Sequence, residues 1–232
     1  MMAKHTKERI LEVAAQVFEE RGYHATGVAT ILRTAGVKSG SLYHFFSSKE
    51  DLLAAVMQRH LDRLRPMIIE RAVADSVTDD PLEHVFSLLG VYRRGLLISG
   101  STQGCPVGNL ALEVGGQMPR VRKLIEEYFS IWVAQVLAWL VAAGDRLPAS
   151  LDRAALAHHV LAVAQGGIMQ ARAAESLEPF DASVAQLRSS IELLAARSHY
   201  KSGASHDVMV GEPQTAEENG ADAEDQFEWR AW

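Results

Sequence analysis

Residues 26–49 read TGVATILRTAGVKSGSLYHFFSSK, the most informative part of the sequence. Apolar residues recur at helical spacing on either side of a glycine, which predicts one short helix ending at Ala35 and another over Ser39–Phe45. Gly36 allows the sharp turn between them. Two short helices joined in this way form a helix-turn-helix, whose second helix can enter the major groove of DNA.

The second helix of this pair has a polar outer side that suits DNA. Small residues at its start let the backbone approach the duplex closely, flanking lysines can neutralise phosphates, and a tyrosine and a histidine can donate to phosphates or reach base edges. Leu42 and Phe46 are expected to face inward. A helical hairpin inside an ordinary bundle would show the same spacing, but the basic and small residues on the outer side favour DNA binding. The residues expected to contact DNA are Lys38, Ser39, Gly40, Ser41, Tyr43, His44 and Lys49.

Helical spacing also dominates the rest of the chain, and no segment has the alternation typical of a strand. We expect a first helix to end at Gly22, Thr26 to cap the second helix, and Ser48 to cap the helix that follows. Further helices are expected from Pro81, over Pro106–Val114, from Pro119 to Gly144, over Asp152–Ala174 and over Asp181–Arg197. The predicted fold class is all-α, with about nine helices.

One pattern of residue types and spacing extends over residues 4–56. It is carried by Phe18, Gly22, Tyr23, Thr26, Val28, Ile31, Ala35–Val37, Gly40–Phe46 and Ser48–Leu52. In this pattern the sequence resembles the TetR/AcrR family of bacterial transcriptional regulators. The resemblance implies an N-terminal three-helix DNA-binding domain over residues 1–48 and a C-terminal helical ligand-binding and dimerisation domain over residues 49–199. It also implies a homodimer that represses transcription at a pseudo-palindromic double-stranded DNA operator until a small-molecule effector releases it, and by position it adds Thr26 to the DNA contacts.

Three positions depart from the family pattern. Gly27 replaces a Thr or Ser that is common there, Lys38 and Ser39 stand in the reverse of the commoner order, and Phe45 stands where His is frequent. These changes bear on the operator sequence rather than on DNA binding itself. The stretch GCPVGNLALE at residues 104–113 resembles a segment of some regulators of this family and names no ligand.

The C-terminal half carries much apolar and aromatic surface. Most of it is expected to form core, and part could line a cavity for an apolar ligand, with a few polar side chains as anchors. The candidate anchors are Gln103, Asn109 and Gln165. The full set of candidate ligand-binding residues is Phe86, Gln103, Cys105, Asn109, Trp132, Gln165 and Met169.

Cys105 is the one cysteine of the chain, which excludes an intramolecular disulfide and a cysteine zinc cluster. At a helix start its thiol could have a lowered pKa and sense electrophiles or oxidants, whereas a buried position would leave it inert. The pair His158-His159 points to different helix faces, so no metal site and no cofactor are expected. No catalytic motif supports an enzyme, and activity in the C-terminal half is the remote third alternative.

Small residues around Gly166-Gly167 and an apolar stripe of Val184, Leu187, Ile191 and Leu194 could build a two-fold, four-helix interface. Packing inside one chain would use the same residues, and the family resemblance favours the dimer.

Charge is distributed unevenly along the 232 residues. The net charge of −6 comes almost wholly from residues 201–232, which hold eight acidic and two basic residues and few apolar ones. We expect residues 200–232 to be an acidic, disordered tail. The N-terminal residues lack the apolar stretch of a signal peptide, and no uncharged run reaches the ~20 apolar residues of a membrane span. A cytoplasmic protein without a membrane partner is therefore expected.

Overall fold

The computed structural model describes residues 2–203, and within them every regular element is a helix. Three consecutive elements, α4 (Lys49–Arg63), the π-helical η1 (Leu64–Ile69) and α5 (Glu70–Ala74), follow one another without a break. Counted as one helix, they bring the number in the described chain to nine, as predicted. Pro66 lies inside η1, and its missing N–H accounts for a local change of helix type there.

The N-terminal unit consists of α1 (Met2–Arg21), α2 (Val28–Ala35) and α3 (Ser39–Phe45). Gly36 ends α2 in a left-handed conformation with φ 61°, and its N–H donates to carbonyls of the last turn. Leu42 and Phe46 are buried against α1 and α2, as predicted. The helix-turn-helix expected from residues 26–49 is thus present.

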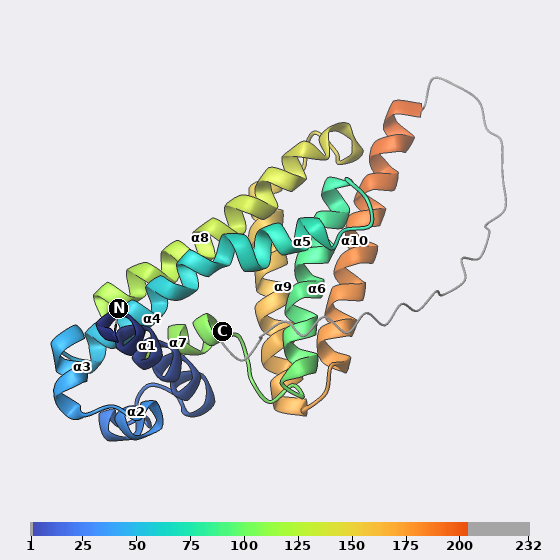
Figure 1. Cartoon of the computed structure of the whole chain (residues 1–232). Helices are drawn as coiled ribbons and strands as arrows, with labels where there is room; N and C mark the ends of the chain where they lie inside the picture. Colours follow the sequence, from blue (N-terminus) through green and yellow to red (C-terminus); the bar gives the residue numbers. More distant parts are fainter. Residues whose placement is uncertain (1, 204–232) are drawn as a thin grey trace.

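In the C-terminal part, a bundle of helices crosses a layer of long helices. In Figure 1, α8 and the α4–α5 run lie side by side, and α6, α9 and α10 cross them. A proline at the first position begins α6, α7 and α8, and Asp80 and Asp152 cap α6 and α9 through their side chains. The elements are α6 (Pro81–Ile98), α7 (Pro106–Val114), α8 (Pro119–Ala142), the short 3-10 turn η2 (Gly144–Arg146), α9 (Arg153–Ala174) and α10 (Glu178–Gly203).

The last helix is longer than the sequence predicted. It begins at Glu178, because Pro179 is tolerated in a first helical turn, and it continues to Gly203. The predicted start of the tail at residue 200 therefore falls inside α10. The rest of the predicted disordered tail, residues 204–232, lies outside the described residues.

Helix α8 is long and apolar enough to cross a membrane by length and composition alone. It packs against α4, α6, α7 and α9, and Val121, Trp132 and Leu140 are among its fully buried side chains. This environment explains its apolar composition as that of a central core helix.

The contact between α9 and α10 depends on Gly167, where an added Cβ would lie 3.1 Å from the Phe180 ring and 3.3 Å from its Cα. We expect Gly167→Val to lower the free energy of unfolding by about 1–3 kcal/mol, measured by urea unfolding. The control is Gly90→Ala in α6, where no atom lies within 4 Å of an added Cβ. At this position the higher helix propensity of Ala predicts that the free energy of unfolding rises by up to about 1 kcal/mol. Equal losses in both variants would contradict this assignment.

Candidate DNA-binding surface and effector cavity

The outer side of α3 is open to solvent. Lys38 directly precedes the helix, and Lys38, Gly40, Tyr43 and His44 are exposed, with Tyr43 57% accessible. Ser41 is half-buried, and Ser39 forms the first residue of the helix. The structure thus brings most of the predicted DNA contacts onto one short helix.

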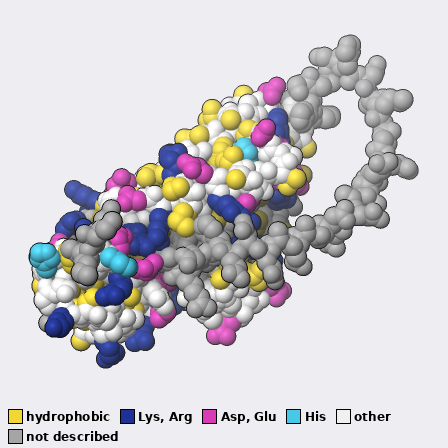
Figure 2. Space-filling model, in the orientation of Figure 1, with side chains coloured by type: hydrophobic (Ala, Val, Ile, Leu, Met, Phe, Trp, Pro, Cys, Tyr) yellow, Lys and Arg dark blue, Asp and Glu magenta, His cyan; other side chains and the backbone are white. Residues whose placement is uncertain are grey.

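Basic and histidine side chains gather at the end of the molecule that α1–α3 form, as Figure 2 shows. Arg33, exposed near the end of α2, adds to this charge and was not among the predicted contacts. Positive charge beside an exposed recognition helix suits the phosphates of a duplex.

Thr26 does not belong to this surface. Its side chain is buried, with 1% exposure, and its hydroxyl donates to the carbonyls of Gly22 at 2.7 Å and Val17 at 3.3 Å. The residue that caps α2 is Gly27, without a side-chain hydrogen bond. Both predictions for Thr26, as a helix cap and as a DNA contact, are therefore wrong, because its hydroxyl closes the end of α1 from inside.

The half-buried Lys49 side chain contacts the turn after α1. Its Nζ donates to the Tyr23 carbonyl at 2.5 Å and lies 4.0 Å from the centre of the Tyr23 ring. Partial burial lowers the pKa of Lys49, and the charge of Glu113 opposes this shift. The ammonium stabilises the turn after α1, and its contact with DNA stays a prediction.

Glu113, near the end of α7, holds the same turn from the other side. Its carboxylate accepts hydrogen bonds from the N–H of Tyr23 at 2.9 Å and of His24 at 2.6 Å. Gly22 fits beneath it with φ 81°, and an added Cβ there would lie 3.1 Å from the carboxylate. Sequence reasoning missed this role, because the partners are about ninety positions apart and no local pattern joins them.

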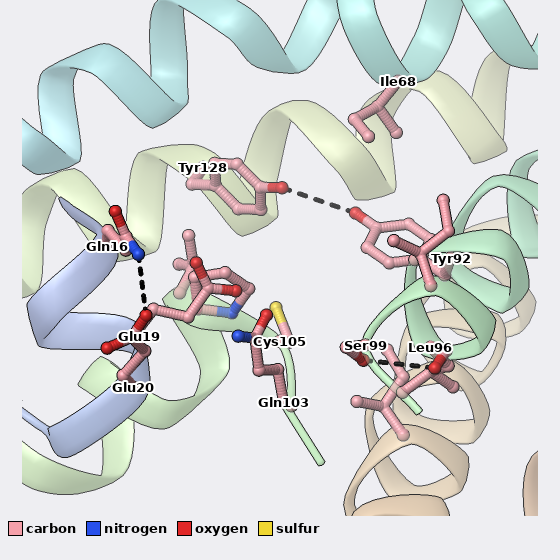
Figure 3. Close-up of a pocket in the computed structure, with 16 residues that line it drawn as sticks. Gln16, Glu19, Glu20, Ile68, Tyr92, Leu96, Ser99, Gln103, Cys105 and Tyr128 are labelled. Atoms are coloured by element: carbon pink, nitrogen blue, oxygen red, sulfur yellow. Dashed lines mark hydrogen bonds between the residues drawn. The ribbon is translucent and has the colours of Figure 1, made fainter. Parts of the chain in front are cut away.

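A cavity of about 300 Å³ lies between α1 and the C-terminal helices. Figure 3 shows Gln16, Glu19 and Glu20 of α1 on one side and Tyr92 of α6 across from them, with Tyr128 of α8 above the α1 residues and its hydroxyl pointing toward that of Tyr92. Of the predicted ligand residues, Gln103 and Cys105 line it. The volume is at the lower end of the range for small-molecule sites.

The other five predicted ligand residues lie outside the wall of this cavity. Trp132 is fully buried behind Tyr92, with ring centres 6.4 Å apart, and Phe86 is covered by the Arg188 guanidinium at 3.8 Å. Met169 is 60% exposed on α9. Asn109 lies against Gly104, and Gln165 lies against Gly108. Helical spacing in the sequence could not show which of these side chains would line the cavity.

Cys105 is the N-terminal cap of α7, and its sulfur accepts a hydrogen bond from the Gly108 N–H at 3.3 Å. The thiol is buried, with 6% exposure. Burial raises the pKa of Cys105 more than the hydrogen bonds at the helix start lower it. Of the two alternatives for Cys105, its environment therefore favours the buried, inert cysteine over the reactive thiol.

Three titratable groups in the cavity wall have raised pKa values. The hydroxyls of Tyr92 and Tyr128 lie 3.4 Å apart, and burial raises the pKa of both. Burial, with a smaller effect of the neighbouring Glu20 charge, raises the pKa of Glu19 to about 8. Within the described residues, no group of three or more His, Cys, Asp or Glu side chains could hold a metal ion.

An exposed basic helix-turn-helix joined to a helical domain with a cavity defines a DNA-binding transcriptional regulator. Residues 10–56 match the profile of the bacterial regulatory proteins of the tetR family. Residues 81–186 match the C-terminal domain of LmrA/YxaF-like transcriptional regulators. The chain belongs to the TetR family.

Relatives of known sequence agree with this assignment. The chain is 30% identical over 129 residues to the uncharacterised regulator YxaF of Bacillus subtilis, covering 56% of this chain and 66% of that protein. It is 28% identical over 176 residues to the regulator LmrA of the same species, covering 75% and 90%. It is also 28% identical over 177 residues to the transcriptional repressor DhaR of a Mycobacterium species, covering 75% and 86%.

Solved structures share the fold. A TetR regulatory protein from Rhodobacter sphaeroides superposes with a TM-score of 0.71 at 24% identity, over 81% of this chain and 97% of that one.

The internal role of Thr26 predicts an effect on stability and none on DNA contacts. Thr26→Val removes the donor while keeping the shape, and we expect the free energy of unfolding to fall by about 1–3 kcal/mol in urea unfolding. Thr34→Val, at an exposed position of α2, is the control and should stay within about 0.5 kcal/mol of the parent. A Thr26→Val variant as stable as the parent but with weaker DNA binding would restore the original interpretation.

Proposed function

We propose that this protein is a cytoplasmic, homodimeric repressor, with no enzymatic activity, that leaves its DNA operator when a small molecule enters the cavity. The observation that carries this proposal is the composition of the cavity wall, which includes both α1 of the DNA-binding unit and helices α6, α7 and α8. A molecule bound there contacts both parts, and it can shift the regulator between two states if it binds them unequally. The relative DhaR is a transcriptional repressor, which supports repression rather than activation by this protein.

Helix α7 offers a physical route between effector and DNA. Its first turn, with Cys105 and Pro106, lines the cavity, and Glu113 at its other end holds the turn between α1 and α2. A shift of α7 on ligand entry would therefore move or release that turn, and α2 and α3 follow it in the chain. The spacing of two recognition helices in a dimer depends on this kind of movement.

The α9–α10 face supports the dimer. Leu187 and Ile191 of the predicted stripe are buried inside the chain, and Gly167 packs on Phe180, so these residues serve internal packing. A shallow groove between the two helices remains, lined among others by Ala162 and Gly166. Small residues along a groove allow helices of a second copy to approach closely. Such a two-fold pairing would present two α3 helices to successive major grooves.

DNA binding by α3 predicts a specific change in salt dependence. We expect Lys38→Ala to weaken binding to a genomic operator fragment and to reduce the slope of log affinity against log salt by about 0.9 per lost phosphate contact. Fluorescence anisotropy at several salt concentrations measures both. Arg197→Ala, exposed near the far end of α10 (Figure 1), is the charge-matched control and should leave the slope unchanged. No preference for any genomic fragment over random duplex would refute the proposed function.

The hydrogen bonds that Glu113 accepts from the turn predict an effect on DNA binding that is independent of salt. Glu113→Ala leaves the Tyr23 and His24 N–H groups without their acceptor, and we expect faster amide hydrogen exchange there and about tenfold weaker DNA binding. Because Glu113 does not neutralise phosphate, the salt slope should stay that of the parent. Glu127→Ala, exposed on α8, removes the same charge as a control. Unchanged exchange at both amides would contradict this role.

A further inference from the structure

The cavity wall carries charge of one sign only. Its charged side chains are Glu19 and Glu20, and no Lys or Arg of residues 2–203 is among the residues that line it. Glu20 accepts a hydrogen bond from the Gln16 amide at 2.8 Å and is exposed, whereas Glu19 is half-buried. An anionic molecule entering this space would meet two acidic side chains and no Lys or Arg of the wall.

Glu19 is the group whose charge is least compensated. Its carboxyl lies in the cavity beside Gln103 and Cys105 (Figure 3), and the electrostatic effect of Glu19 reaches the Cys105 thiol. The other titratable groups in the wall are Glu20 on the same helix, Cys105 at the start of α7, Tyr92 on α6 and Tyr128 on α8. None of them carries positive charge, and burial, followed by the charge of Glu20, raises the pKa of Glu19.

The opposite wall is aromatic and apolar. Tyr92 and Tyr128 contribute two rings, and Leu96, Val107 and Ile168 contribute aliphatic surface. Aromatic faces attract cations, and aliphatic surface favours an apolar body. The wall thus has a negative end on α1 and an aromatic, apolar end on α6 and α8.

We propose that the cavity selects an organic cation, a substituted ammonium with an aromatic or branched apolar body, whose charge pairs with Glu19 while its body lies against Tyr92 and Tyr128. A neutral molecule of the same shape would leave the carboxyl without a partner. Because Glu19 is on α1, the pair would tie the DNA-binding unit to the bound molecule. The link between the bound cation and DNA binding rests on the proposed function. The choice of an organic cation as the ligand class does not.

Benzyltrimethylammonium and its neutral isostere 2,2-dimethylpropylbenzene differ only in one charged nitrogen in place of carbon, so they isolate the effect of charge. We expect the full-length parent protein to bind the cation about tenfold or more tightly than the isostere in titration calorimetry. At pH 7 the cation should also release protons, detectable as a dependence of the heat on the buffer, because this ammonium cannot titrate and Glu19 must ionise.

Glu19→Gln tests the residue itself. We expect the variant to lose the preference for the cation and the proton release while keeping its affinity for the neutral isostere, which also reports that the cavity is intact. Glu126→Gln, exposed on α8 and outside the cavity, is the control for net charge and should behave as the parent.

Equal affinity of the parent for both compounds, or an undiminished preference in Glu19→Gln, would overturn the proposal. Release of DNA is measured separately, with each compound added to the operator complex. Selective binding of the cation without release would support the ligand class and refute its role as effector. Release by the neutral isostere alone would overturn the ligand class and leave the regulator intact.

Discussion

The turn between α1 and α2 is the point on which the arrangement of the protein depends. Two groups far apart in sequence hold it: the ammonium of Lys49 on the Tyr23 carbonyl and ring, and the carboxylate of Glu113 on the N–H groups of Tyr23 and His24. Hydrogen bonds to charged groups are among the stronger polar contacts of a folded chain. Because α2 and α3 follow directly, this turn fixes where the recognition helix lies relative to the C-terminal domain.

The cavity lies near this turn, between α1 and the C-terminal helices. Its wall takes residues from α1 and from the start of α7, so the two ends of α7 contact the cavity and the turn. One rigid helix is thus long enough to connect the two. In the proposed mechanism, regulation would need no contact between effector and DNA, only a difference in how the two states hold α7.

Cys105 illustrates how a helix terminus and burial compete. The start of α7 offers hydrogen bonds that favour a thiolate, while removal from water disfavours it, and burial has the larger effect. The cysteine is therefore a small buried cap whose sulfur stabilises the first turn of α7. Glu19 differs from it, because the half-buried carboxyl faces open space that a cation could fill.

Helical periodicity, prolines at helix starts and the glycine turn at Gly36 are local signals, so they predicted most of the helices and the recognition unit. They also predicted Lys38 directly before the recognition helix and Tyr43 and His44 on its outer side. Contacts between distant segments make Thr26 point inward and place Glu113 on the turn. They also make Gln103 and Cys105, but not Phe86, Trp132 and Met169, line the cavity. Spacing defines one face of a helix, but the partner of that face comes from segments many residues away. The same apolar residue types occur in the core and in the cavity wall, so only the packing of all helices together shows which residue belongs to which.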